Sequence, residues 1–368
     1  MIYVFDKKGS FMDNFSIENF SSLVGSWEFL KTTKLPIFIY GMGDGALKIL
    51  RVFDEKNIAC AGFFASDEFV RGHYFEGHKV HKLSEIEEIL GNDFVIVLAF
   101  ACGYESLITQ ITQIANKHIL LAPDVPVIGE GLFTKEYVFE NFEKIKEVYE
   151  MLADEKSKQV FIKSIEFKIT GDIKYLKEID TPSSEAFEEI LCITDNEDFV
   201  DLGAYNGDTV EEFVEQSKGF YNSIIALEPD KRNFKKLKKN TESLKDIKLY
   251  NCASWWCDTT LSFSNSAGRQ AMLSKKGVDV NARSVDSILN GQSASFIKFD
   301  VEGAEKQAIE GCKNTILKYK PKMKIALYHR NEDIFSIPMT IKQLNNSYKL
   351  YMRKLPYIPA WEINLYCI

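Results

Sequence analysis

The sequence predicts an α/β protein with two doubly wound units, each a parallel sheet covered by helices on both faces. Short continuous apolar runs alternate with segments whose apolar residues recur every three or four positions, a pattern typical of parallel strands joined by helices. In each half of the chain, one strand-like run ends in a glycine-rich loop, as in Rossmann-like units. The length of 368 residues also suits two domains of about 150 residues each.

The first Rossmann-like unit is expected over residues 34–132, after an N-terminal arm at residues 1–33. Its strands are expected at the apolar runs, which lie at residues 36–40, 58–64, 94–100 and 118–121. Helical spacing predicts helices between these runs, at residues 46–53, 83–90 and 103–116. The next stretch, residues 133–183, has no strand-like run and is rich in Glu and Lys, so a helical linker is expected there.

The second unit is expected over residues 184–368, where Ser183 or Ser184 is placed to cap a helix at residues 185–191. Strand-like runs lie at residues 199–202, 223–227, 247–250, 296–299 and 324–328, with helices expected at 208–216 and 231–240. The last two runs, 348–353 and 362–368, have no helix between them. They are therefore expected to form a terminal antiparallel β-hairpin.

Composition and charge exclude several classes of protein. The chain is 45% hydrophobic and 27% charged, as in globular proteins, and its net charge of −8 argues against nucleic-acid binding. The longest apolar run, residues 94–102, is too short to span a membrane, and the N-terminus lacks the pattern of a signal peptide. Seven cysteines without a CxxC pair favour reduced thiols in the cytoplasm, and no metal site is expected from the five histidines.

The glycine loop of the second unit points to a ligand site. Residues 200–207 read VDLGAYNG, and Glu228 follows at the tip of the next predicted strand. Glycines let a backbone approach a ligand closely, and an acid at this place accepts ribose hydroxyls. The spacing differs from GxGxxG, which favours a nucleoside without phosphates. The alternative is a glycine-rich turn with an unrelated glutamate.

A second cluster of polar residues lies in FIKFDVEGAE, at residues 296–305. Asp300 is expected at the carboxyl edge of the sheet, where doubly wound sheets bind ligands. Glu302 and Glu305 follow in the turn into the next helix, and Lys298 precedes them. Such a cluster can hold a hydroxyl, a metal ion or a positively charged group. The alternative is an acidic helix N-terminus, which the helix dipole favours.

In their order along the chain, these segments resemble the FkbM family of S-adenosylmethionine-dependent methyltransferases. The resemblance covers residues 184–368 and is carried by VDLGAYNG, ALEPD, NCAS, RSVDSIL, FIKFDVEGAE, LYHRNEDIFSIP and WEINLYCI. It implies a class I methyltransferase fold with a seven-stranded sheet that ends in the antiparallel hairpin. It also implies transfer of a methyl group to a hydroxyl of a sugar, glycan precursor or related glycosylated metabolite, as in polysaccharide biosynthesis.

Carried over position by position, the resemblance implies a site for S-adenosyl-L-methionine and a methyl-transfer centre. The expected cofactor-binding residues are Asp201, Gly203, Ala204, Tyr205, Asn206, Gly207, Asp208, Glu228, Ala253 and Ser254. The catalytic candidates are Asp300, Glu302 and His329, each of which is a candidate base for the hydroxyl proton. For His329 the alternative is a structural hydrogen bond at a strand end. A divalent ion on Asp300 and Glu302 is a further alternative, but no other ligand is evident.

The first glycine loop supports a rival hypothesis. Residues 40–46 read YGMGDGA and match GxGxxA through Gly41, Gly43 and Ala46, while Asp67 is placed to meet a ribose hydroxyl. In this hypothesis the loop binds NAD(P) or a nucleotide-sugar, and the protein is an oxidoreductase or binding module with an inert methyltransferase fold. A purely structural loop is a third alternative. The presence of the complete second loop, Glu228 and Asp300 favours the methyltransferase hypothesis, because an inert site would not need them.

The expected partner is a small-molecule or glycan-precursor substrate, free or nucleotide-linked. No nucleic acid and no membrane are expected as partners. The sequence leaves the oligomeric state open, including a homo-oligomer.

Overall fold

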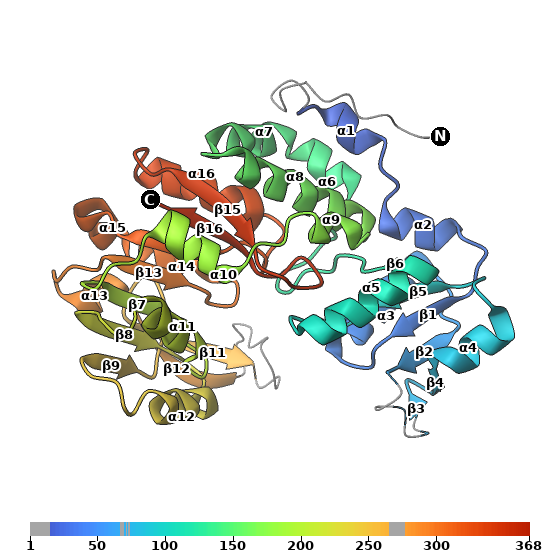
Figure 1. Cartoon of the computed structure of the whole chain (residues 1–368), viewed down its shortest axis with the longest axis horizontal. Coiled ribbons are helices and arrows are strands. Elements are labelled where there is room, and N and C mark those ends of the chain that lie inside the picture. Colours follow the sequence, from blue (N-terminus) through green and yellow to red (C-terminus); the bar gives the residue numbers. More distant parts are fainter. Residues whose placement is uncertain (1–14, 67–69, 71, 73, 265–276) are drawn as a thin grey trace.

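The computed structural model describes residues 15–66, 70, 72, 74–264 and 277–368. These residues form two large sheets and a small three-stranded one. Figure 1 shows the N-terminal sheet in blue and cyan and the C-terminal sheet in yellow-green to red, with helices α6–α9 between and above them. None of the described helices is long and apolar enough to cross a membrane.

The N-terminal sheet has the strand order β3-β4-β2-β1-β5-β6. The four expected strands are present and parallel, as β1 (Ile37–Tyr40), β2 (Gly62–Ala65), β5 (Val95–Leu98) and β6 (Ile119–Leu121). The hairpin of β3 (Tyr74–Phe75) and β4 (His78–Lys82) was not expected. Its sequence is polar because β4 lies near the edge of the sheet and has exposed residues, so no apolar run marks it.

Helices cover both faces of this sheet, because successive strand residues point to opposite sides. The elements that precede and connect the strands are α1 (Ile17–Ser21), α2 (Ser26–Thr32), α3 (Asp44–Lys56), α4 (Leu83–Leu90) and α5 (Glu105–Lys117). Ile39 packs in one core with side chains of α2 and α3. Tyr40, its neighbour on β1, packs in the other core with side chains of α4 and α5.

The region between the sheets is helical, as expected for a linker. It contains α6 (Lys135–Glu140), α7 (Phe142–Met151), α8 (Glu155–Thr170) and α9 (Lys174–Lys177). Helix α8 also contacts the C-terminal sheet. Its Ser157 hydroxyl accepts a hydrogen bond from the Met352 amide of β15 at 2.8 Å. The linker therefore serves as part of the packing of the C-terminal unit.

One helix start differs from the expectation. Helix α10 (Ser183–Glu185) runs into a π-helical turn, η3 (Ala186–Leu191), and Pro182 occupies the N-cap position. Neither Ser183 nor Ser184 is the cap, since the helix already begins at Ser183 and its N-cap makes no side-chain hydrogen bond. The predicted serine cap is therefore wrong.

The C-terminal sheet confirms the fold expected for the second unit. Its strands are β7 (Asp198–Leu202), β8 (Ser223–Leu227), β9 (Ile247–Tyr250), β13 (Phe296–Phe299), β14 (Lys322–Ala326), β15 (Leu350–Lys354) and β16 (Ile363–Cys367). The order is β15-β16-β14-β13-β7-β8-β9. All neighbours pair in parallel except β16, which lies antiparallel between β14 and β15.

Helices cover both faces of the C-terminal sheet as well. Helices α11 (Asp208–Gln216) and α12 (Lys231–Asn240) share one core with η3. The opposite core includes α13 (Val285–Leu289), α14 (Glu305–Glu310), α15 (Lys313–Tyr319) and α16 (Asp333–Leu344). A small unexpected sheet contains β10 (Ala253–Ser254), β11 (Thr259–Ser264) and β12 (Gly277–Arg283).

Candidate active site

The carboxyl ends of β7, β8, β13 and β14 meet at one edge of the C-terminal sheet, because these strands are parallel neighbours. The glycine loop follows β7, Glu228 follows β8, Asp300 follows β13 and His329 lies beyond β14. The topology therefore brings all three motifs of the sequence to the edge where doubly wound sheets bind ligands.

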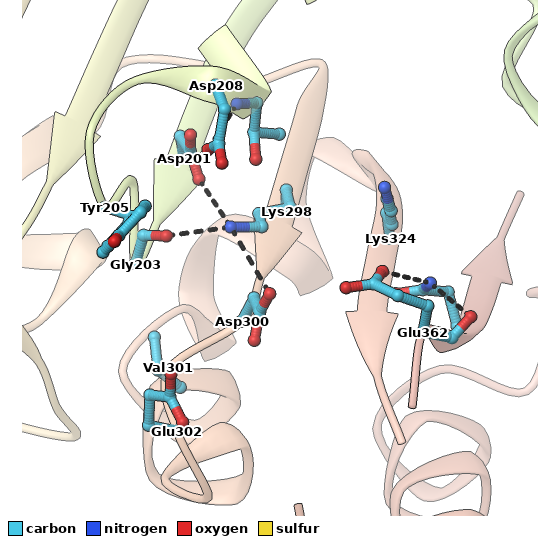
Figure 2. A network of polar contacts seen from close by, with 12 residues as sticks. Asp201, Gly203, Tyr205, Asp208, Lys298, Asp300, Val301, Glu302, Lys324 and Glu362 are labelled. Carbon is cyan, nitrogen blue, oxygen red and sulfur yellow. Dashed lines mark hydrogen bonds and ion pairs between the residues drawn. The ribbon is translucent and has the colours of Figure 1, made fainter. Parts of the chain in front are cut away.

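A buried lysine connects the first and third of these motifs (Figure 2). Lys298 lies directly opposite Asp201 in the register of β13 and β7, so both side chains are on the same face of the sheet. The Lys298 Nζ atom lies 3.2 Å from Asp201 Oδ1 and 3.9 Å from Asp300 Oδ2, and it donates to the Gly203 carbonyl at 2.9 Å. Asp201 is fully buried beneath the loop. Burial raises its pKa, and Lys298 opposes that rise.

Only glycine fits at the start of the loop. Gly203 has φ +84°, and a Cβ there would lie 1.8 Å from the Asp300 carbonyl oxygen. The amides of Gly203 and Ala204 both donate to the Leu227 carbonyl, at 3.0 and 2.9 Å. The chain after β7 thus passes in direct contact with the chain after β13, while it is also tied to β8.

Glu228 is held against the same loop. Its carboxylate accepts hydrogen bonds from the amides of Tyr205 at 2.9 Å and Asp230 at 2.8 Å. Burial raises the pKa of Glu228 to about 7, although these two hydrogen bonds act in the opposite direction. Asn251, in the NCAS segment, donates to the carbonyls of Glu228 and Pro229, a role that the sequence did not reveal.

The other expected cofactor residues lie around this loop and on the small sheet. Asn206 precedes Gly207, which is the N-cap of α11 with φ +95°, and Asp208 is exposed in the first turn of that helix. Ala253 and Ser254 form β10, which pairs with β12 and not with the central sheet. Ser254 is buried, and its hydroxyl has no hydrogen-bond partner among the described residues.

The three catalytic candidates come together. The His329 Nε2 atom lies 3.4 Å from Asp300 Oδ1 and 3.5 Å from Glu302 Oε2. The imidazole is almost fully buried, at 1% exposed, whereas the Asp300 side chain is 29% exposed and that of Glu302 is 42% exposed. Of these three side chains, the two carboxylates are therefore the ones that a ligand can reach from solvent.

Glu305 and Tyr328 join this cluster, although the sequence did not single them out as catalytic. The Glu305 Oε1 atom lies 3.0 Å from His329 Nδ1 and accepts the Val301 amide. The Tyr328 hydroxyl donates to Asp300 Oδ1 at 3.2 Å. Burial alone would lower the pKa of His329, but the neighbouring carboxylates, Glu305 foremost, hold it well above its ordinary value. The sequence shows Glu305 in the EGAE motif, but its partner, His329, lies in another segment, so the pairing could not be predicted.

Glu362 is a further acid that the sequence did not single out. It lies just before β16, near Lys324 of β14 (Figure 2), and its carboxylate interacts electrostatically with Asp300 and Lys324. Burial raises the pKa of Glu362, and Asp300 raises it further, whereas Lys324 lowers it. It therefore adds a further acid to those at this edge of the sheet.

A loop from the N-terminal half also reaches the cluster. We call residues 126–131, between β6 and α6, the bridging loop. The Ile128 amide donates to the His329 carbonyl at 3.0 Å, and Asn331 donates to the Gly131 carbonyl at 3.2 Å. Lys48 of α3 donates to the carbonyls of Pro126 and Val127 in the same loop. The two halves are thus joined at the candidate active site.

The first glycine loop is shaped largely by packing within the chain. Gly41 has φ +117°, and a Cβ there would lie 2.9 Å from the Phe100 ring, while a Cβ on Gly45 would lie 2.2 Å from the Ala99 carbonyl oxygen. Gly43 has no neighbour within 4 Å of such a Cβ, and Ala46 is buried. The predicted ribose ligand, Asp67, lies outside the described residues.

The seven-stranded sheet, together with the glycine loop and the acid after the next strand, defines the class of this half of the chain as a methyltransferase. A family model described as the methyltransferase FkbM domain matches residues 201–350. That range contains the loop, Glu228 and the acidic cluster. The family that the sequence resembles is therefore the one whose model matches this part of the chain.

A solved methyltransferase structure resembles the chain in fold. The methyltransferase FkbM from Methylobacillus flagellatus KT has a TM-score of 0.68 at 21% identity, over 91% of this chain and 90% of that one. The likeness therefore includes the N-terminal half. An rRNA methylase from Streptococcus thermophilus has a TM-score of 0.34 at 12% identity, over 50% of this chain and 92% of that one.

A third structure is Aeropyrum pernix fibrillarin in complex with natively bound S-adenosyl-L-methionine. Its TM-score is 0.33 at 9% identity, over 50% of this chain and 73% of that one. The likeness to the rRNA methylase and to fibrillarin is too slight to carry an argument. A search of curated proteins finds no match.

Proposed function

We propose that the protein is an S-adenosyl-L-methionine-dependent O-methyltransferase that acts on a hydroxyl of a sugar, a glycan precursor or a related glycosylated metabolite. The observation that carries the proposal is the position of Glu228, a buried acid after β8 that is joined to the glycine loop through the Tyr205 amide. An acid at this position in a doubly wound sheet suits the two hydroxyls of a ribose.

The residues at the sheet edge fit the parts of this cofactor. The loop begins with Gly203, which has no side chain, so a ligand can approach the backbone there closely. Ser254 offers a buried hydroxyl that has no hydrogen-bond partner among the described residues. The loop would hold the methionine end, Glu228 the ribose, and Ala253 and Ser254 the adenine. Bound S-adenosyl-L-methionine supplies a methyl group on a sulfonium, which needs no protein electrophile.

The chain's own residues would then align the acceptor and receive its proton. Asp300 is the preferred base, because its carboxylate follows β13, next to the glycine loop, and is partly exposed. The Tyr328 hydroxyl donates to Asp300 and would fix its orientation. His329 is too buried to touch an acceptor directly and would act through Asp300 and Glu302. Such base catalysis is worth roughly 10²- to 10⁴-fold in rate.

We also propose the division of the chain into an arm at 1–33, a Rossmann-like domain at 34–132, a helical linker at 133–183 and the methyltransferase domain at 184–368. The acceptor would be a small molecule or glycan precursor that meets the enzyme in the cytoplasm. The rival NAD(P) hypothesis for the first loop has less support. Packing within the chain accounts for Gly41 and Gly45.

Titration of the purified protein with S-adenosylhomocysteine by calorimetry tests the proposed function. We expect micromolar binding to the wild type and a loss of at least about tenfold in Glu228→Ala, since a ribose hydroxyl bonded to a carboxylate contributes roughly 1.5–3 kcal/mol. Glu215→Ala, which removes an exposed carboxylate of α11, is the matched control and should bind normally. Absence of binding to the wild type, or equal binding by Glu228→Ala, would contradict the proposal.

The same binding should depend on pH through Glu228. Its pKa of about 7 means that the carboxylate is protonated below neutrality, and a protonated acid accepts ribose hydroxyls less well. S-adenosylhomocysteine affinity should therefore be steady above about pH 7 and fall about tenfold per unit below it. Calorimetry at about pH 8 and about pH 6 measures this change. Glu228→Gln should remove the dependence, and a flat profile in the wild type would exclude this role.

A further inference from the structure

Asp300, Glu305 and His329 form a compact group of side chains that can act as metal ligands. Each offers one ligand atom, and these atoms all lie within 4.8 Å of one another. They come from the end of β13, the start of α14 and the chain beyond β14. Glu305 Oε1 lies 3.0 Å from His329 Nδ1, whereas Asp300 Oδ1 lies 3.4 Å from Nε2, the other ring nitrogen. An ion would bond to one of these two nitrogens, and the carboxylate on the other side would have to move toward it within the 4.8 Å spread of the ligand atoms. Neighbouring ligands of one ion, with bonds of about 2.1 Å, lie about 3 Å apart.

Unpartnered buried atoms distinguish this group from an ordinary acidic helix start. Glu305 and His329 are each 1% exposed. The buried Glu305 Oε2 and His329 Nδ1 atoms have no hydrogen-bond partner among the described residues, even though Nδ1 is so close to Glu305 Oε1. A buried polar atom without a partner costs about 1–3 kcal/mol, so these atoms point to a ligand between them.

The charge of the cluster favours a cation. The carboxylates of Asp300, Glu302 and Glu305 surround a single imidazole, which even when protonated offsets only one of their three negative charges. The nearest lysine, Lys298, lies 3.9 Å from Asp300 and is already bound to Asp201 and the Gly203 carbonyl. A doubly charged ion would balance the excess of negative charge, and the partly exposed Asp300 leaves it a path from solvent.

We propose that Asp300, Glu305 and His329 bind one divalent transition-metal ion, of the Mn²⁺ to Zn²⁺ series, at the methyl-transfer centre. The imidazole ligand favours these ions over Mg²⁺ and Ca²⁺, which prefer oxygen ligands only. From the sequence no metal was expected, and an ion on the carboxylates of residues 300–305 was only an alternative, because no ligand from another segment was evident. Folding adds His329.

The role of this ion rests on the proposed function. An acceptor hydroxyl bound to the ion would lose its proton more readily, because the positive charge stabilises the alkoxide. With Asp300 as a ligand, Glu302 replaces it as the base, and the proton passes to the Glu302 carboxylate, which is 42% exposed beside His329. The alkoxide oxygen then forms a bond to the methyl carbon, the carbon–sulfur bond breaks, and its electron pair stays on the sulfur of S-adenosylhomocysteine.

Mn²⁺ is the probe for the first test, which uses the full chain after removal of metal with EDTA. Titration followed by electron paramagnetic resonance should reveal one tight site. Pulsed measurements on the wild type should show coupling of the ion to one imidazole nitrogen. This readout requires no variant, so it remains valid if a substitution prevents folding. No binding at millimolar Mn²⁺, or a bound ion without nitrogen coupling, would overturn the proposal.

Variants locate the ion. Glu305→Gln and His329→Gln should each weaken Mn²⁺ binding at least about tenfold, as expected for loss of a ligand or its support. Glu310→Gln is the matched control, because Glu310 is an exposed carboxylate at the other end of α14, paired with Lys313. Equal Mn²⁺ binding by all three variants would place the ion elsewhere and overturn the assignment.

Titration of the metal-free protein with S-adenosylhomocysteine separates this inference from the proposed function. If S-adenosylhomocysteine binds and Mn²⁺ does not, the metal site is wrong and the methyltransferase proposal stands. If Mn²⁺ binds with nitrogen coupling and S-adenosylhomocysteine does not, the metal site stands and its role in methyl transfer is wrong.

Discussion

Gly203→Ala is expected to destabilise the protein by about 3 kcal/mol or more, and to abolish binding of S-adenosylhomocysteine. The left-handed conformation costs a residue with a Cβ about 1–2 kcal/mol, and forced overpacking typically costs a further 1–3 kcal/mol. Here the Cβ would lie 1.8 Å from the Asp300 carbonyl oxygen, which is backbone and cannot turn aside as a side chain would. Denaturant unfolding measures the stability, and calorimetry measures the binding.

Gly43→Ala is the matched control, because Gly43 lies in the corresponding loop of the N-terminal sheet. Its φ is −108°, and a Cβ there would have no neighbour within 4 Å. We expect a loss of at most about 1 kcal/mol, because alanine is a poorer N-cap than glycine but would meet no steric contact there. Similar losses for both variants would show that contact between the loops after β7 and β13 is not what requires glycine at position 203.

Lys298→Met is expected to destabilise the protein by about 3–5 kcal/mol, because it leaves the fully buried Asp201 carboxylate without its partner. Lys298 also donates to the Gly203 carbonyl, so the glycine loop should loosen at the same time. Urea unfolding of the wild type and the variant gives the difference in free energy. Asp201→Asn/Lys298→Met removes the unpaired charge and should recover part of the loss.

The loss in Lys298→Met should shrink as the pH falls. Burial raises the pKa of Asp201, and removal of the lysine takes away the charge that opposes this rise. The folded variant therefore binds a proton more readily than the unfolded chain, so its stability relative to the wild type increases with falling pH. Unfolding at about pH 8 and about pH 5 tests this. If the difference in the free energy of unfolding between the wild type and Lys298→Met stays constant or grows as the pH falls, the assignment to Asp201 is wrong.

Much of the fold was readable from local sequence. The expected segments 208–216, 223–227, 231–240, 247–250 and 296–299 coincide with α11, β8, α12, β9 and β13. Strands buried on both faces are continuous apolar runs, and the helices that cover them repeat their apolar residues every three or four positions. Strand β4 and the small sheet escaped this reasoning, since partly exposed strands lack a continuous apolar run.

The sequence by itself determined the fold class, the glycine loop after β7 and the acid after β8, because each is a contiguous motif with a local physical signal. Only the tertiary structure decided that Glu305 and His329, 24 residues apart in the sequence, lie 3.0 Å apart. It also brought the bridging loop from the other half to the His329 carbonyl. Local periodicity predicts which segments become strands and helices, whereas strand order and packing decide which side chains meet.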